Sequence, residues 1–366
     1  MTAINADSSR RTSDPDLVTI QFCISHHSRH DSGVARSRVT SGTAGGRAVE
    51  KLICLGGTDI SVSPLGLGTW QWGDRLIWGY GATHTDRDLH DALQASLEAG
   101  VNLLDTAEVY GRGRSERLLG AYLQEWREQS GTVRPVVATK FMPFPYRLRK
   151  GALRSALRAS LDRLKMDRID LYQVHWPLPP VPIGVWADAL AEVVEGGLAR
   201  SVGVSNYNAA QMSRAHAVLS RRGIPLASNQ VEYHLLNRRV ERNGLMGLCR
   251  ALGISLIAYS PLAKGLLTGK YGPEAPPPGL RRRLTSRARL GAIQPLVTLM
   301  RTIGQDHDGK SPAQVALNWI MAKEAIPIPG AKNGRQAREN GSAMGWRLTD
   351  SEVAALDLAS NGVGPR

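Results

Sequence analysis

The sequence predicts an α/β protein whose main domain is a (β/α)8 TIM barrel with an N-terminal hairpin and an extra C-terminal helix. Three observations lead to this fold class. Short apolar segments alternate with helix-like segments eight times over about 300 residues, as such a barrel requires. Polar side chains follow several of these apolar segments, at the strand ends where barrel enzymes place their active sites. The competing doubly wound fold lacks its fingerprint, because Gly111-Arg112-Gly113 has no third glycine at the required spacing.

The chain of 366 residues divides into three parts in this prediction. Residues 1–50 are rich in Ser, Arg, Thr, Gly and His, show no helical or strand period, and are expected to form a disordered tail. A transit peptide, or translated sequence upstream of the true start, remains an alternative for this segment. Residues 51–360 are expected to form the barrel, and residues 361–366 a C-terminal tail.

The elements of the barrel are predicted in chain order from turn residues and apolar periods. Residues 52–55 and 60–63 flank a glycine turn and predict a hairpin. Strands are expected where short apolar runs follow turns, at 64–68, 101–104, 133–139, 169–174, 199–204, 226–231, 254–259 and 326–329. Helices are expected where apolar residues recur every three to four positions, at 86–99, 115–128, 150–164, 184–196, 208–221, 245–252, 293–304, 312–323, 335–345 and 350–359. A long loop rich in Pro, Gly and Arg is predicted at 260–286.

The amino-acid composition limits the classes of molecule that the protein is expected to bind. The formal net charge of +14 is compatible with nucleic-acid binding or with attraction of an anionic small molecule. Apart from the run Arg281–Arg283 the basic residues are scattered, and no nucleic-acid-binding motif accompanies them, so no nucleic-acid partner is expected. No apolar run is long enough to span a membrane. The three cysteines, Cys23, Cys54 and Cys249, are few and far apart, which favours a reducing, cytoplasmic location without disulfides or a zinc site.

Four polar residues stand at the ends of three successive predicted strands. Asp105 ends the second strand and Tyr110 lies on the loop after it, while Lys140 ends the third strand and His175 the fourth. Each alone has a structural explanation, as a loop cap, a packing residue, an edge lysine or a buried hydrogen-bonded imidazole. Because successive strands are neighbours in a barrel, we expect the four side chains to meet at one mouth.

The chemistry of the four residues favours proton donation to a carbonyl that receives a hydride. A tyrosine with a pKa near 10 is a weak acid at neutral pH. A neighbouring ammonium is expected to lower that pKa, and a carboxylate holds the ammonium in place. The phenol can then protonate a carbonyl oxygen that an imidazole orients. No metal-ligand cluster and no nucleophile beside a base occurs in the set, so no metal is expected.

Seven segments of the chain resemble the aldo-keto reductase superfamily. They are GVNLLDTAEVYG (100–111), VVATK (136–140), LYQVHWP (171–177), GVSNY (203–207), NQVEYHLLNR (229–238), AYSPLAKGLLTGKY (258–271) and IPIPGAKNGRQAREN (326–340). They occur in family order, and the chain looks closest to the branch with potassium-channel β subunits and pyridoxal-type, plant and bacterial NADP-dependent oxidoreductases. The resemblance implies NADPH-dependent reduction of aldehydes or ketones to alcohols by hydride transfer, with NADPH/NADP preferred to NADH.

The resemblance also implies roles for the four strand-end residues. Tyr110 would be the general acid, Lys140 and Asp105 would tune it, and His175 would orient the substrate. Channel β subunits carry Asn where this chain has His175, so the histidine favours a working reductase. An NADPH-binding regulatory or redox-sensing subunit without significant turnover remains the alternative.

The implied cofactor contacts fall into three groups along a dinucleotide. Around the nicotinamide they are Thr69, Trp70, Asp105, Ser205, Asn206, Gln230 and the stacking ring Tyr259. Around the pyrophosphate they are Ser260, Pro261, Leu262, Lys264, Gly265 and Lys270. On the adenosine side they are Gly330, Lys332, Gln336, Glu339 and Asn340. Lys332, with Arg281–Arg283, suits a 2′-phosphate and hence NADPH, although the arginine run could also be a solvated loop.

The substrate side rests on tryptophans near the predicted mouth. Trp70, Trp72, Trp78 and Trp176, with Trp186 nearby, are expected to supply an apolar pocket for an aromatic or apolar carbonyl compound, unless some of them only pack in the core. The sequence leaves open whether the chain is a monomer or a homo-oligomer. A plastid location would replace the cytoplasm if residues 1–50 were a transit peptide.

Overall fold

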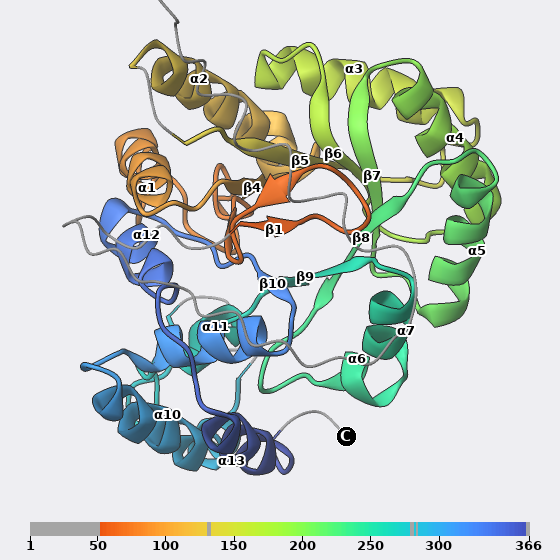
Figure 1. Cartoon of the computed structure of the whole chain (residues 1–366). Helices are drawn as coiled ribbons and strands as arrows, with labels where there is room; N and C mark the ends of the chain where they lie inside the picture. The colour runs from red at the N-terminus through yellow and green to blue at the C-terminus, as the bar shows by residue number, and fades with distance from the viewer. Residues whose placement is uncertain (1–51, 130–132, 279–281, 283–284, 364–366) are drawn as a thin grey trace, which may run out of the picture. The chain divides into compact units, whose positions relative to one another are not determined.

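The structure is a computed structural model that describes residues 52–129, 133–278, 282 and 285–363 (Figure 1). The predictions for the tail at 1–50, for Arg281 and Arg283, and for residues 364–366 of the tail at 361–366 therefore lie outside the described residues.

Eight parallel strands form the barrel, and the predicted fold class is confirmed. The strands are β3 (Gly66–Gly68), β4 (Leu103–Asp105), β5 (Val136–Phe141), β6 (Ile169–Val174), β7 (Ala199–Ser205), β8 (Leu226–Glu232), β9 (Ser255–Tyr259) and β10 (Ile326–Pro327). Each pairs with the next in chain order. Gly68 bridges to Gly330 and donates its N–H to the carbonyl oxygen of Pro329 at 3.0 Å, which joins the first strand to the last. A Cβ on Gly68 would lie 2.8 Å from the oxygen of Ile328, so glycine permits this approach.

Helices follow the strands and surround the sheet in Figure 1. They are α1 (Asp86–Glu98), α2 (Arg114–Glu128), α3 (Gly151–Leu164), α4 (Ile183–Glu195), α5 (Ala209–Ser220), α6 (Arg239–Arg242), α7 (Leu245–Ala251), α9 (Arg287–Ala292), α10 (Gln294–Asp306), α11 (Pro312–Ala322), α12 (Gly334–Gly341) and α13 (Asp350–Ser360). Capping boxes begin four of them, at Thr85, Asn208, Ser311 and Thr349. None of the helices in the described part combines the length and apolar character needed to cross a bilayer.

Some predicted boundaries are wrong for local reasons. Strand β4 begins at Leu103 rather than 101, because the side chain and backbone of Asn102 bond to Ser63 beside the hairpin. Strand β5 begins at Val136 rather than 133, after Pro135. Helix α12 ends at Gly341 rather than 345. The predicted loop at 260–286 contains a 3-10 segment, η4 (Ala263–Thr268), and helix α6 was not predicted.

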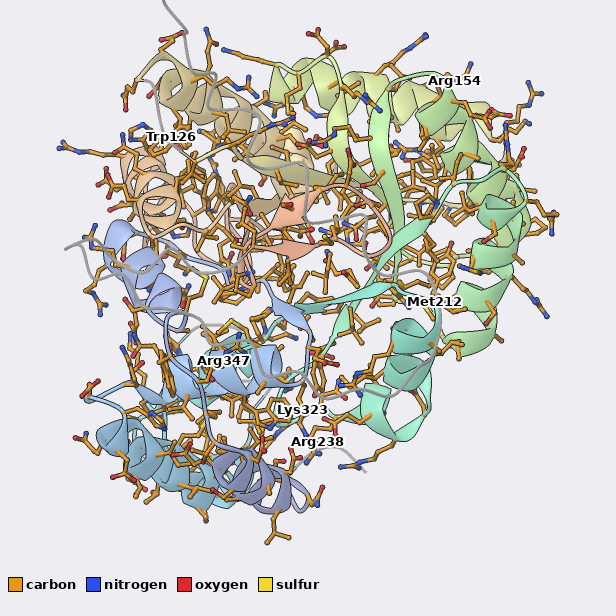
Figure 2. The ribbon with its side chains drawn as sticks, viewed as in Figure 1. Trp126, Arg154, Met212, Arg238, Lys323 and Arg347 are labelled. Carbon is orange, nitrogen blue, oxygen red and sulfur yellow. The ribbon has the colours of Figure 1, made fainter. Side chains whose placement is uncertain are left out.

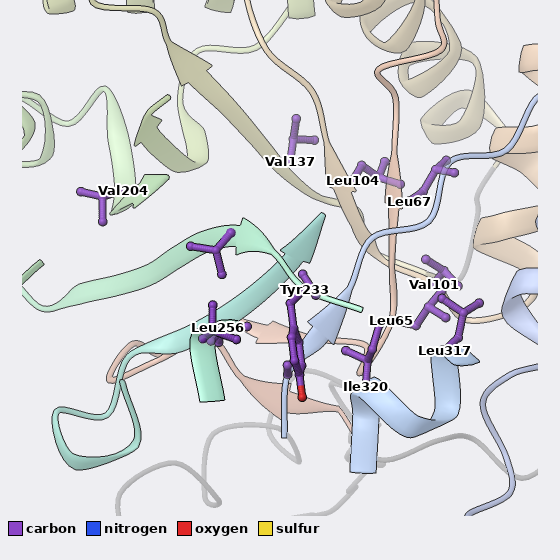
Figure 3. Packing of buried hydrophobic residues seen from close by; sticks show 14 of the residues in the cluster. Leu65, Leu67, Val101, Leu104, Val137, Val204, Tyr233, Leu256, Leu317 and Ile320 are labelled. Atoms are coloured by element: carbon purple, nitrogen blue, oxygen red, sulfur yellow. The ribbon is translucent and has the colours of Figure 1, made fainter. Parts of the chain in front are cut away.

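The hairpin β1 (Ile53–Cys54) and β2 (Ser61–Val62) closes the N-terminal end of the barrel. Its apolar side chains join the inward side chains of the strands in one buried cluster of Leu55, Ile60, Val62, Leu103, Val136, Ala138, Leu171, Ala227, Ile257, Ile326 and Ile328. Gly56 has a φ of +57°, and a Cβ there would lie 2.3 Å from the oxygen of Ala227, so glycine is required. A larger cluster fills the space between strands and helices, where Figure 3 shows Leu104, Val137 and Ile320 among its members.

Candidate active site

A buried ion pair lies at the C-terminal ends of β4 and β5. The ammonium of Lys140 donates to Asp105 Oδ1 at 2.5 Å, to the carbonyl oxygen of Thr106 at 2.8 Å and to the hydroxyl of Tyr110 at 3.2 Å. The side chains of Lys140 and Asp105 are 0% and 2% exposed. Three acceptors therefore satisfy all three N–H groups of a lysine that has no access to water.

Side chains from two further strands, β6 and β8, extend this ion pair into a buried polar layer. Gln230 of β8 donates its Nε2–H to Asp105 Oδ2 at 2.8 Å, and Gln173 of β6 approaches the same oxygen at 3.5 Å. Ser228 in turn donates to Gln173 Oε1 at 3.4 Å. The layer rests on the apolar cluster inside the barrel, so strands β4, β5, β6 and β8 hold the Asp105 carboxylate rigidly.

Tyr110 begins a tight turn, the 3-10 segment η3 (Tyr110–Gly113). Gly111, Arg112 and Gly113 all have positive φ, at 54°, 56° and 81°. A Cβ on Gly111 would lie 3.0 Å from Gly73, so the turn packs tightly against the loop after β3. This backbone turns the chain sharply after the tyrosine and leaves its phenol beside Lys140.

His175 follows β6 and faces the tyrosine. The two rings meet edge to face with centroids 5.8 Å apart. The backbone of His175 is fixed at both ends, since its N–H donates to Phe141 and its carbonyl accepts from Asn206 Nδ2 at 3.0 Å. Its buried Nδ1 has no hydrogen-bond partner among the described residues. The structure thus brings Asp105, Tyr110, Lys140 and His175 together, as the strand order predicts.

The protonation states differ in one respect from the prediction. Burial raises the pKa of Tyr110, and the nearby Lys140 ammonium opposes this without reversing it, so the expected net lowering is wrong. Burial alone would lower the pKa of Lys140, but Asp105 and Tyr110 outweigh it and raise the pKa. Burial, together with Lys140, lowers the pKa of His175 to about 3. At neutral pH the site holds a neutral phenol, an ammonium and a neutral imidazole.

A cavity of about 910 Å³ opens above these residues. Asp105, Tyr110 and His175 line it, whereas Lys140 lies in the wall beneath. The predicted cofactor residues that line it are Thr69, Trp70, Asp105, Asn206, Gln230, Tyr259, Ser260, Pro261, Leu262, Lys264, Gly265, Lys270, Gly330, Lys332, Gln336, Glu339 and Asn340. Ser205 is the exception: it does not line the cavity, and its hydroxyl accepts a hydrogen bond from Asn206 Nδ2 at 3.0 Å.

The predicted tryptophans separate into two groups. Trp70, Trp78 and Trp176 line the cavity, and the rings of Trp70 and Trp78 meet edge to face at 5.5 Å. The prediction for Trp72 is wrong, because its ring is fully buried in the core and its indole N–H donates to the carbonyl oxygen of Ala331 at 3.2 Å. Trp186 of α4 is also buried, and packs on Phe141.

The positively charged side chains that line the cavity come from the segments that follow β9 and β10. Lys264 and Lys270 follow β9, and Lys332 and Arg335 follow β10; no other Lys or Arg among the described residues lines the cavity. Ser260, Ala263, Lys264 and Gly265 have positive φ, so successive backbone N–H groups can converge on an anion. The ammonium of Lys332 donates to the carbonyl oxygen of Trp78 at 2.6 Å, at the cavity wall.

Sequence reasoning missed several lining residues. Glu232 ends β8 and lines the cavity, and its pKa is lowered chiefly by the neighbouring His234 and also by Lys264. The strand-end rule that identified Asp105 would have identified Glu232, which directly follows the predicted strand at 226–231. Gln71, Tyr271 and Asn333 lie on loops, Thr268 ends η4, and Arg335 is the second residue of α12, and none of the five carries a comparable signal.

Comparisons with known proteins show the family of this chain. A model of the aldo/keto reductase family matches residues 64–361. The chain is 44% identical over 310 residues to the chloroplastic pyridoxal reductase of Arabidopsis thaliana, covering 82% of this chain and 84% of that protein. It is 30% identical to aldo-keto reductase YhdN of Bacillus subtilis, covering 84% and 94% of the two chains.

Solved structures show the same fold. The glycerol dehydrogenase AKR11B4 from Gluconobacter oxydans superposes with a TM-score of 0.74 at 29% identity, covering 87% of this chain and 98% of that one. An aldo-keto reductase from Klebsiella pneumoniae in complex with NADPH superposes with a TM-score of 0.67 at 26% identity, covering 87% and 97%.

Proposed function

The chain belongs to the aldo/keto reductase family and is an NADP-dependent oxidoreductase, and from this premise we propose that it reduces aldehydes or ketones to alcohols with Tyr110 as the general acid. The observation that carries the proposal is the position of Lys140, whose buried ammonium donates to both Asp105 and the Tyr110 hydroxyl below the cavity. Bound NADPH would supply the hydride.

Each side chain of the site has a separate part in the proton transfer. Tyr110 is a neutral phenol and donates its proton to the carbonyl oxygen as that oxygen gains charge. Lys140, 3.2 Å from the hydroxyl, stabilises the phenolate that remains, and Asp105 keeps the ammonium in position. His175 is neutral and orients the same carbonyl oxygen through a ring N–H.

The cavity fits a dinucleotide that carries an additional phosphate. Asn206 and Gln230, with Ser205 behind them, would hold the carboxamide, and Tyr259 would stack on the nicotinamide; its hydroxyl is fixed by Asn206 at 2.9 Å. The positive-φ loop after β9 would bind the pyrophosphate. Lys332 and the neighbouring Arg335 would bind the 2′-phosphate, which selects NADPH over NADH.

The substrate is proposed to be an aromatic aldehyde without net charge, such as pyridoxal. Val109 and Trp176, which adjoin Tyr110 and His175 in the chain, line the cavity together with Trp70 and Trp78. The described Lys and Arg side chains that line the cavity follow β9 and β10, so an anionic substrate bound away from these segments would lose water without gaining a counter-ion. Trp176 is 40% exposed and offers an aromatic face at the mouth. The relationship to pyridoxal reductase supports the same substrate class.

The experiment is an NADPH-oxidation assay with matched pairs of aldehydes. Pyridoxal is compared with pyridoxal 5′-phosphate, and methyl 4-formylbenzoate with 4-formylbenzoate. We expect kcat/KM for each neutral member to exceed that for its charged partner by about tenfold or more, the effect of about 1.4 kcal/mol. Equal values within both pairs would contradict the substrate class. NADPH binding without oxidation by any carbonyl compound would contradict the reductase and favour the regulatory subunit.

A separate proposal concerns residues 1–50. The family model begins at residue 64, which supports residues 51–360 as the catalytic domain and residues 1–50 as a segment outside it. The Arabidopsis relative is described as chloroplastic, so a plastid location competes with the cytoplasm. A fluorescent protein fused behind residues 1–50 would distinguish them, since only a transit peptide would direct it into plastids.

A further inference from the structure

A second cavity, of about 650 Å³, lies at the end of the barrel opposite to the active site. Four arginines line it, Arg127, Arg134, Arg168 and Arg200, together with the carboxylate of Asp170 and the ring of Trp126. None of these residues lines the first cavity or has a part in the proposed reaction. Figure 2 labels Trp126, which belongs to α2.

The parallel sheet explains why these arginines meet. Arg134 lies two residues before β5, Arg168 immediately before β6, and Arg200 is the second residue of β7. The three strands are neighbours and run in one direction, so their starting ends share one edge. Arg127 reaches the same place from the last turn of α2. The topology that gathers catalytic residues at one end of the barrel thus gathers arginines at the other.

The positive charge of this cavity is only partly neutralised. Arg200 pairs with Asp170 at 3.0 Å and with the exposed Asp59 at 3.7 Å. Both carboxylate oxygens of Asp170 have a partner, because the second oxygen accepts a hydrogen bond from the N–H of Val137 at 2.9 Å. Among the described residues, Arg168 donates only to the carbonyl oxygen of Ala199, at 3.3 Å.

Arg127 and Arg134 form no ion pair with any carboxylate in the described ranges, and the same is true of Arg168. Four guanidinium groups therefore face Asp170 in the cavity wall and Asp59 beside Arg200, a net formal charge of +2. Like charges that gather without counter-ions repel one another, and an anion bound between them would relieve that repulsion.

The chemistry of the wall points to phosphate. Guanidinium groups bind phosphate oxygens through paired, charge-assisted hydrogen bonds. The indole N–H of Trp126 donates to the carbonyl oxygen of Val133 at 3.2 Å, which fixes the ring beside the arginines. Pro135 and Met166 add apolar surface to the same wall. We propose that this cavity binds a phosphate-bearing small molecule, with the phosphate between Arg134 and Arg168 and an apolar or aromatic portion against Trp126.

The test uses inorganic pyrophosphate as the probe and isothermal titration calorimetry as the readout. The full chain is first saturated with NADP, so that the first cavity is filled. The variant Arg134→Gln/Arg168→Gln removes two charges from the second cavity. The control variant Arg158→Gln/Arg214→Gln removes the same charge from exposed positions on α3 and α5.

We expect saturable binding of one pyrophosphate per chain, weakened by about tenfold or more in the cavity variant and by less than about twofold in the control. Equal weakening in both variants would overturn the proposal, because it would show a general effect of net charge. Absence of saturable binding would also overturn it. Binding of a single-stranded RNA that both variants weaken equally, without binding of pyrophosphate, would show a diffuse polyanion surface instead.

Discussion

Replacing Lys140 by methionine tests the buried ion pair in the barrel. Methionine keeps most of the volume but leaves Asp105 without its counter-ion, at a position that is 2% exposed. The variant loses three hydrogen bonds, and of the described side chains Gln230 and Gln173 still bond to the carboxylate. Removing one partner of a buried pair typically costs about 3–5 kcal/mol, and we expect Lys140→Met to lower the free energy of unfolding by that amount.

The uncompensated carboxylate should account for most of the lost stability. Because most of the cost comes from the uncompensated carboxylate, Asp105→Asn/Lys140→Met should recover about 2 kcal/mol relative to Lys140→Met. The pair Arg250–Glu324 is the control, since its side chains are 52% and 73% exposed, and Arg250→Met should cost about 0–1 kcal/mol.

Urea denaturation followed by circular dichroism and by tryptophan fluorescence measures these values. A loss below about 1 kcal/mol for Lys140→Met would refute the account of the pair. So would a double variant whose cost equals the sum of the two single variants, because it would show that the two side chains are not coupled.

Three further results are expected. The pKa of His175 is about 3 in the folded chain against about 6.5 when unfolded, so protonation favours unfolding as the pH falls below 6.5. Between pH 7 and pH 5 the parent should therefore lose about 2 kcal/mol more stability than His175→Asn, as urea denaturation at both pH values would show. Gly203→Ala places a Cβ 2.3 Å from Ser228 Oγ inside the barrel and should cost about 1–3 kcal/mol, whereas Gly247→Ala meets no described atom within 4 Å and should cost nothing. Lys332→Met should weaken NADPH binding by about tenfold or more and leave NADH binding unchanged, which fluorescence titration with both cofactors would measure.

The positions of the strands could be predicted from sequence because each is a short apolar run between turn residues. Their order was expected from the regular alternation of eight β–α units, and with it the convergence of Asp105, Lys140 and His175 at one mouth. Boundaries were less predictable where side chains outside the strand compete for its backbone, as the side chain of Ser63 does for the N–H of Asn102.

The failures concern properties that depend on burial in three dimensions. Trp70 and Trp72 are two residues apart, yet one lines the cavity and the other lies in the core. The pKa of Tyr110 is another case, because the sequence identifies the neighbouring ammonium but not the extent of desolvation that outweighs it. The arginine cavity was likewise not predicted, since Arg127, Arg134, Arg168 and Arg200 are dispersed in the sequence and only the barrel brings them together.

Replacing Tyr110 by phenylalanine tests the proposed reaction most directly. The change removes one oxygen atom, whose hydrogen bond from Lys140 is 3.2 Å long, and leaves the lining of the cofactor loops intact. Single-turnover reduction of pyridoxal with NADPH is measured beside the dissociation constant of NADPH, with Tyr146→Phe, at a 74% exposed ring, as the control. The account predicts an NADPH affinity within about twofold of the parent and a rate lower by about 10²- to 10⁴-fold. Reduction by Tyr110→Phe at the rate of the parent would contradict it.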